Sequence, residues 1–194
     1  MKSLILLLAL FTTFSSLSQR NETVFDTHHK GNYLAISFGG TKINDNSTGV
    51  VGIRAMSISN KVAYGLVARG LFSGREPYID GNRQAKYYGL YGGFMVNPTL
   101  FSVWAFSISA TGSIGGGWIG QYEYITDGYT IYTKNKSVFG YVEPGLEAEL
   151  QLTYDFKLSI GGYYMFKHTV EDWSEIDPSL GRLSVLVCLK WGFF

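Results

Sequence analysis

The sequence predicts an all-β protein: an eight-stranded antiparallel up-and-down transmembrane β-barrel with short periplasmic turns and long outer loops. Three observations support this prediction. Apolar and polar residues alternate with a period of two in about eight segments. The connections between these segments alternate between short and long. The final segment, Arg182 to Phe194, carries its apolar residues on one face up to an aromatic end and cations on the other, which is typical of a strand between lipid and a polar lumen.

Residues 1–18 have the features of a secretory signal peptide. Lys2 is a short positive region, Leu4–Phe11 is an apolar run, and Ser16 and Ser18 are small residues at the expected cleavage site before Gln19. We expect residues 19–30 to be a periplasmic lead-in and residues 31–194 to form one barrel domain. No later segment is an unbroken apolar run of about 20 residues, so we expect any membrane crossing to be made by strands.

The composition limits the possible functions. The chain has 24 glycines and 4 prolines, with 16% aromatic and 16% charged residues, which is typical of many strands. A net charge of +1 predicts no basic surface for nucleic acid. The single cysteine, Cys188, has no partner for an internal disulfide. His28 and His29 are adjacent and would point in opposite directions on an extended chain, so we expect no metal ion and no cofactor.

The first two strands are predicted at Gly31–Gly39 and Gly49–Ser59, with a polar connection between them. The first alternates from Leu34 to Phe38. The second has the weakest alternation, and its most informative residue is Arg54. A guanidinium facing lipid would be costly, so Arg54 should face inward.

A short turn at residues 59–61 leads to the third strand, Val62–Phe72. A long polar loop, Ser73–Ala85, precedes the fourth strand, Lys86–Val96. Residues 97–99 contain Pro98 and are predicted to be a tight turn, because proline is tolerated where no ladder donor is needed.

The fifth strand is predicted from Leu100 to about Ser113, with serines and a threonine on its inner face. The connection at 114–136 is the longest. It contains a strand-like piece, Tyr122–Tyr132, around the Asp127-Gly128 pair, which indicates a hairpin extending above the membrane.

The sixth strand is predicted at Ser137–Thr153, and a turn at residues 154–155 joins it to the seventh, Phe156–Lys167. A polar loop at 168–181 precedes the closing strand. Short connections after even strands and long ones after odd strands fit a membrane barrel with both termini in the periplasm. The competing fold is a soluble, lipocalin-like barrel, in which the same alternation would place the apolar residues inside.

The inner faces of the predicted strands carry an unusual number of charges. An eight-stranded barrel is only wide enough for its side chains to fill, so these charges should neutralise one another. We expect Glu143 near Arg69 and Arg182, toward the outer half, and the other two glutamates toward the periplasmic half. The predicted lumen ion-pair network comprises Glu143, Glu147, Glu149, Arg54, Arg69, Lys157, Arg182 and Lys190. It would seal the lumen; the alternative is a narrow, gated ion path.

An enzymatic function has little support in the sequence. Glu147 and Glu149 share a strand face, but neighbouring cations would keep both ionised instead of separating an acid from a base. A lipid A deacylase would be expected to show a His-x-Ser pair with a following Glu, whereas His168 is followed by Thr169 and Val170. We therefore expect no catalytic residues. The outer loops are rich in Tyr and Trp, which could form a recognition surface or pack the loops themselves.

The closing strand ends in Trp191, Phe193 and Phe194, and this aromatic end resembles the C-terminal assembly signal of bacterial outer-membrane proteins. Residues 31–194 as a whole resemble the small outer-membrane barrels of the OmpA/OmpX class. The resemblance implies a Gram-negative host and a location in the outer membrane, surrounded by lipid and lipopolysaccharide. It also implies insertion by the barrel-assembly machinery and a monomeric protein. It implies a role in membrane integrity or adhesion, through a surface ligand of the outer loops. The alternatives are a narrow porin-like channel or transport accessory and, less favoured, a lipid A-modifying enzyme.

Overall fold

The computed structural model describes residues 30–43, 46–73, 83–125, 131–172 and 180–194. They form one antiparallel sheet of nine strands. The strands are β1 (Lys30–Ile43), β2 (Asn46–Ser59), β3 (Val62–Ser73), β4 (Arg83–Val103), β5 (Phe106–Ile125), β6 (Ile131–Gln151), β7 (Phe156–Tyr164), β8 (Phe166–Asp172) and β9 (Leu180–Gly192). Within these residues, no helix is long and apolar enough to cross a membrane.

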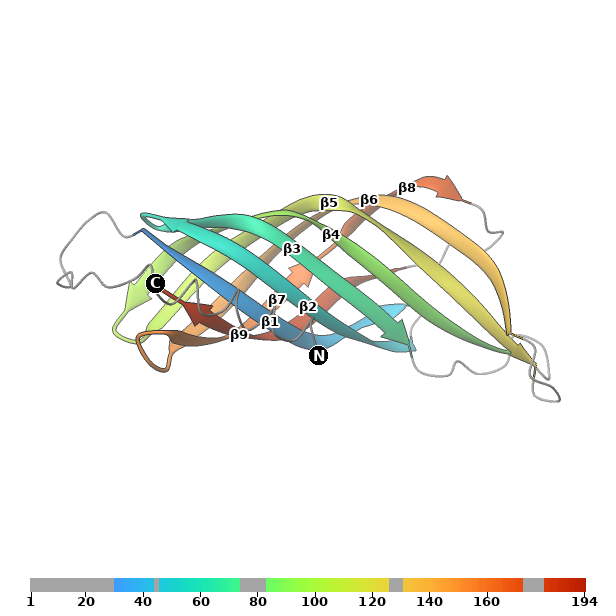
Figure 1. Cartoon of the computed structure of the whole chain (residues 1–194), viewed down its shortest axis with the longest axis horizontal. Helices are drawn as coiled ribbons and strands as arrows, with labels where there is room; N and C mark the ends of the chain where they lie inside the picture. The colour runs from blue at the N-terminus through green and yellow to red at the C-terminus, as the bar shows by residue number, and fades with distance from the viewer. Residues whose placement is uncertain (1–29, 44–45, 74–82, 126–130, 173–179) are drawn as a thin grey trace, which may run out of the picture.

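The sheet closes on itself. Consecutive strands pair from β1 to β6, the β5–β6 ladder joins the ends of the strand order, and β9 pairs with both β1 and β7. β7 and β8 both pair with β6 and are separated only by Met165, so together they make one wall strand. The fold is therefore a closed antiparallel barrel of eight wall strands, as the sequence predicts (Figure 1).

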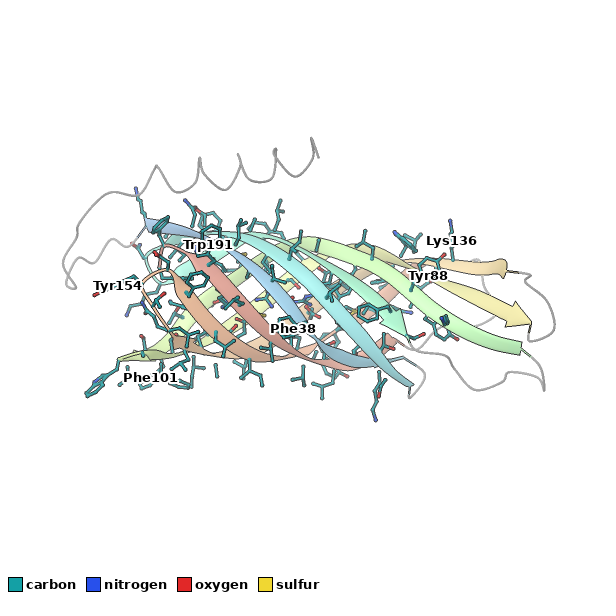
Figure 2. The ribbon with its side chains drawn as sticks, turned by 60° about the horizontal axis from the view of Figure 1, so that its bottom comes forward. Phe38, Tyr88, Phe101, Lys136, Tyr154 and Trp191 are labelled. Atoms are coloured by element: carbon teal, nitrogen blue, oxygen red, sulfur yellow. The ribbon has the colours of Figure 1, made fainter. Side chains whose placement is uncertain are left out.

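The period-two alternation divides the side chains between the outside and the lumen. Every wall strand exposes at least one large aliphatic residue near its middle. Figure 2 shows side chains projecting outward all around the wall. This apolar belt comprises Ile36, Ile53, Leu66, Leu90, Ile114, Leu146, Ile160 and Val185. A continuous apolar exterior of this size is the lipid-facing surface of a membrane barrel. The inverted, lipocalin-like assignment is wrong.

The turn predicted at residues 97–99 is wrong. These residues continue β4, and the chain reverses at Trp104 and Ala105, where Trp104 has a φ of 56°. The β4–β5 register passes from Val96–Gly112 to Thr99–Ser109 with no bridge at Pro98, and a bulge follows between Thr99 and Phe101. On its other side Pro98 pairs with Val62, the first residue of β3. Proline is tolerated here because it lies at the end of one ladder and beside a bulge in the other.

The turns at Asn60–Lys61 and at residues 153–155 lie where the sequence predicts them. They share one end of the barrel with the Trp104 turn. We call it the short-turn end, and the opposite end the loop end (Figure 1).

The connection predicted at 114–136 is largely β-strand. β5 runs on to Ile125 and β6 begins at Ile131, so the predicted hairpin is an extension of two wall strands; its Asp127-Gly128 pair lies outside the described residues. Gly115 was expected to lie in this connection. In the structure it pairs with Gly93, and a Cβ on Gly115 would collide with the backbone of residues 92 and 93. Glycine is needed there for the close approach of β4 and β5.

The other long connections are also shorter than predicted. Of the loop at 73–85, Ser73 belongs to β3 and residues 83–85 to β4. Of the loop at 168–181, residues 168–172 form most of β8 and residues 180–181 begin β9. The β1–β2 ladder continues to Ile43 and Asn46, and Lys30 is part of β1 instead of the lead-in. The remaining parts of these connections, the signal peptide at 1–18 and the lead-in at 19–29 lie outside the described residues.

The apolar belt predicts a depth-dependent cost for a charge on the outer face. Leu66, near the middle of β3, is 65% exposed, and Val62 lies on the same face at the short-turn end. We expect Leu66→Arg to lower the free energy of unfolding in lipid vesicles by about 2–4 kcal/mol, and Val62→Arg by at most about 1 kcal/mol. Urea titration of the refolded barrel measures both. Equal, negligible costs for the two variants would argue against a lipid-facing belt.

Candidate functional site: the ion-paired lumen

The lumen is lined by small hydroxyl side chains alternating with long charged and aromatic ones. β5 supplies four of the buried hydroxyl groups, more than any other strand, and the buried carboxylates come from the inner face of β6. The buried hydroxyl residues are Ser37, Thr41, Thr48, Ser107, Ser109, Thr111, Ser113, Ser137, Ser159 and Ser184. Their small volume leaves room for the charged side chains of the other strands, so this pattern lets a narrow barrel hold several ions.

Glu147 on β6 is the centre of the lumen. Its carboxylate accepts hydrogen bonds from Arg54 Nη1 of β2 at 2.5 Å and from Lys190 Nζ of β9 at 2.7 Å. Tyr163 Oη of β7 donates to the same carboxylate at 2.5 Å and accepts from Arg54 Nη2 at 2.7 Å. Ser159 Oγ adds a longer contact of 3.4 Å. Two cations and two hydroxyls therefore satisfy one fully buried carboxylate.

Glu149 extends this cluster toward the short-turn end. Its Oε1 lies 2.8 Å from Lys190 Nζ and accepts a hydrogen bond of 2.8 Å from Ser109 Oγ. Lys190 thus bridges two carboxylates that lie two residues apart on the inner face of β6. Since Lys190 is 1% exposed, its ammonium is neutralised by these side chains instead of by solvent.

A second ion pair lies on the loop side of Glu147. Arg69 of β3 pairs with Glu143 of β6, both fully buried, and Ser113 Oγ donates to the same carboxylate at 3.3 Å. The Arg69 guanidinium also lies over the ring of Tyr163, 4.8 Å from its centroid. Within the described part of the chain, Arg69 Nε and Nη2 and Glu143 Oε1 have no hydrogen-bond partner. This pair is therefore less completely satisfied than Glu147.

The structure brings six of the eight predicted network residues into ion pairs. Arg54, Arg69, Glu143, Glu147, Glu149 and Lys190 make these contacts, and we call them the lumen network. Lys157 faces the lumen from β7 and lies over the Phe194 ring at 4.2 Å, without an ion pair to any described residue. The side chain of Arg182 lies outside the described residues.

Sequence reasoning missed Tyr163 as a partner of the charges. The period-two alternation places Tyr163 on the inner face of β7. The alternation does not show that the Tyr163 hydroxyl joins Arg54 to Glu147. Gly161 was the available signal, because a Cβ there would lie 2.6 Å from Tyr163 Oη and 2.9 Å from Glu147 Cγ. A glycine two residues before an inward tyrosine leaves the space that the tyrosine hydroxyl and the carboxylate occupy.

The residues predicted as an assembly signal lie at the short-turn end. Trp191 stacks on Phe156 with ring centroids 6.2 Å apart, and Phe193 N donates to Asn32 O at 2.9 Å. The Phe194 ring turns toward Tyr33, with centroids 5.4 Å apart. These contacts join the end of the chain to β1 and β7, its two neighbours in the wall.

The remaining chemistry-bearing residues lie apart from the lumen network. His168 was expected in a loop but lies exposed in β8, opposite Gly140. Cys188 is buried and free. Among the described residues, no group of three or more His, Cys, Asp or Glu side chains has the arrangement of a metal site.

No family model and no curated protein sequence matches the chain. Among solved structures, Neisserial surface protein A matches 84% of this chain and 97% of its own length, with 9% identity and a TM-score of 0.52. Ail of Yersinia pestis, solved in a phospholipid bilayer nanodisc, matches over 85% of this chain and all of its own, with 13% identity and a TM-score of 0.40. The first match shows that the chain has the fold of the small bacterial outer-membrane barrels.

The contacts of Glu147 predict that it contributes more to stability than its neighbour. Glu147→Gln leaves Arg54 and Lys190 without their shared carboxylate, and we expect a loss of about 3–5 kcal/mol in the free energy of unfolding. Glu149→Gln is the matched control, because it removes a single ion pair and should cost less. Urea unfolding in micelles measures both losses.

A double variant isolates the charge effect. Arg54→Met combined with Glu147→Gln should cost less than the sum of the two single changes, because neither charge is then left alone. Additive losses would show that the two residues do not interact in the folded barrel.

Proposed function

We propose that the chain is an integral outer-membrane barrel protein without enzymatic activity. Its lumen is closed by the lumen network, and its loop end is the surface that binds other molecules. The main support for a closed lumen is the position of the Glu147 carboxylate. It lies between Arg54 and Lys190, and all three side chains are buried. In an eight-stranded barrel no free channel remains around such a cluster. A water-filled path would require these charges to be exposed instead.

The lengths of the strands support a surface role for the loop end. Roughly 9–11 residues of a tilted strand cross a membrane, whereas β4, β5 and β6 have 21, 20 and 21 residues. β4 continues past its last pair with β3, Phe72–Tyr88, and β6 continues past its last pair with β8, Ser137–Asp172. At the loop end, the barrel continues as a projecting three-stranded sheet made of residues 83–87 of β4, the paired end of β5 and residues 131–136 of β6 (Figure 1). We infer that this sheet stands outside the cell and carries the loops that hold a surface ligand, consistent with adhesion.

The apolar belt supports the proposed surroundings of the protein. This belt would lie in outer-membrane lipid and lipopolysaccharide, and the barrel-assembly machinery would insert the chain as a monomer. The comparison protein is itself called a surface protein. His168 lies exposed in β8 and is followed by Thr169 and Val170, so it does not form the His-x-Ser pair expected of a lipid A deacylase.

A narrow ion path is the second candidate, and one observation favours it. The Arg69–Glu143 pair leaves polar atoms unsatisfied among the described residues, so it is the part of the lumen network that would open at the lowest cost. A transient path would have to pass this pair and then Glu147.

Planar-bilayer recording separates the two candidates. We expect the refolded wild-type barrel to show no discrete conductance steps, because the lumen network fills its cross-section. A variant with Glu143, Glu147 and Glu149 all changed to Gln is recorded beside it. Ion-selective steps in the wild type that change with these substitutions would support the channel and contradict the closed lumen.

The proposed orientation is tested by labelling in intact Gram-negative cells. Lys136 and Tyr154 are exposed at opposite ends of the barrel (Figure 2). In a Cys188→Ser background, a membrane-impermeant maleimide should label the Lys136→Cys variant in intact cells and the Tyr154→Cys variant only after permeabilisation. The reverse pattern would place the projecting sheet in the periplasm, and labelling of neither variant in a membrane fraction would contradict outer-membrane insertion.

A further inference from the structure

A cavity of about 310 Å³ lies at the short-turn end, between the turns and the lumen network. Its walls come from several strands and include Lys157, Lys190 and Glu149 on one side and Asn97 of β4 on another. Its volume lies at the lower end of the range for small-molecule sites. It borders the lumen network, since Lys190 and Glu149 belong to both.

Most charged side chains that line this cavity are basic. They are three lysines, Lys61, Lys157 and Lys190, and one acidic side chain, Glu149. Glu149 already accepts from Lys190 at 2.8 Å. Lys157 and Lys190 stand directly opposite each other across the β7–β9 ladder, and like charges in that arrangement repel. Lys190 is neutralised by two carboxylates, whereas Lys157 forms no ion pair within 4 Å of any described residue, so Lys157 is the lining cation that a bound anion would pair with.

Asn97 gives an independent indication of a ligand. The residue is 3% exposed, and its Nδ2 is buried without an acceptor among the described residues. A buried amide donor without a partner costs free energy, so such donors are normally paired with protein, water or a ligand. Asn97 and Lys157 both line the cavity, so a neutral and a charged donor residue border the same space.

The cavity also has apolar walls. The rings of Tyr33 and Phe194 lie 5.4 Å apart on its lining, and Ile58 and Leu100 contribute aliphatic surface. The Phe194 ring lies beside the Lys157 ammonium. A molecule that places an anionic group at the donors would therefore have apolar surface available for the rest of its body.

We propose that this cavity binds a small organic anion, a carboxylate or phosphate attached to an apolar body. The oxyanion takes hydrogen bonds from Lys157 Nζ and Asn97 Nδ2, and the apolar body packs against the Tyr33 and Phe194 rings. The bound anion offsets the repulsion between Lys157 and Lys190. Such a group could belong to a free molecule or to a lipid headgroup, since both present the same oxygens.

NMR titration of the folded barrel in an uncharged detergent tests the proposal. The Asn97 side-chain amide and the Lys157 backbone amide are followed while benzoate or phenyl phosphate is added. We expect saturable shifts with a Kd of about 1 mM or below. Benzyl alcohol, which matches benzoate without its charge, should bind at least about tenfold more weakly. Absence of saturation, or equal binding of the alcohol, would overturn the proposal.

Variants assign the donors. Lys157→Gln and Asn97→Leu should each weaken benzoate binding by at least about tenfold, whereas Lys136→Gln, which removes a lysine at the loop end, should leave it unchanged. Unchanged binding in both cavity variants would also overturn the proposal. If one cavity variant does not fold, the other and the comparison of benzoate with its alcohol remain decisive.

The source of the anion is resolved in nanodiscs. In discs of zwitterionic lipid, benzoate should bind as in detergent. If a lipid headgroup is the natural occupant, adding phosphatidylglycerol should shift the Asn97 amide signal and weaken benzoate binding by competition. If a free molecule is the occupant, benzoate binding should be the same in both kinds of disc.

Discussion

Closure of the sheet through the β5–β6 ladder is the constraint on which the rest of the structure depends. Inside a bilayer, backbone N–H and C=O groups have no water to bind, so each must be paired within the protein. Closing the wall removes the free edges that an open sheet would expose. With eight wall strands the enclosed space is narrow, and every second residue of every strand must fit into it. The polar lumen and the apolar belt are two consequences of this one closure.

The lumen network shows how such an interior accommodates charge. Glu147 and Arg54 lie 93 residues apart in sequence, on β6 and β2, and meet across the barrel. Tyr163 joins the two parts of the network, because its hydroxyl contacts Glu147 and Arg54 while its ring lies beneath Arg69. Buried ion pairs add little net stability, but removing one partner is costly. We infer that the network favours the one register in which each charge finds its partner.

The two ends of the barrel present different chemistry. At the loop end, β4, β5 and β6 continue beyond their neighbours as a projecting sheet. At the short-turn end, the β4–β5 hairpin carries Trp104, which is 99% exposed, and the lumen opens into the lysine-lined cavity. The lumen network lies between these ends, so the proposed surface role and the proposed anion site are independent.

The sequence alone predicted the class of fold, the eight wall strands and the face on which Arg54, Ile36 or Ser109 lies, because a period of two is a local property of an extended chain. It failed at Pro98 and at Gly115, residues that usually mark turns. In the structure, Pro98 is accommodated because it lies at the end of the β3–β4 ladder and beside a bulge in the β4–β5 ladder. Gly115 is required because β4 and β5 approach closely there. These reasons depend on neighbouring strands and have no local signature.

The sequence by itself thus determined which side chains enter the lumen and which face lipid. Only the tertiary structure decided which of them meet: that Glu147 takes both Arg54 and Lys190, that Tyr163 joins them, and that Lys157 and Asn97 line one cavity. The physical reason is that alternation fixes the direction of a side chain, whereas its partner depends on the stagger of strands distant in sequence, which is set when the barrel closes.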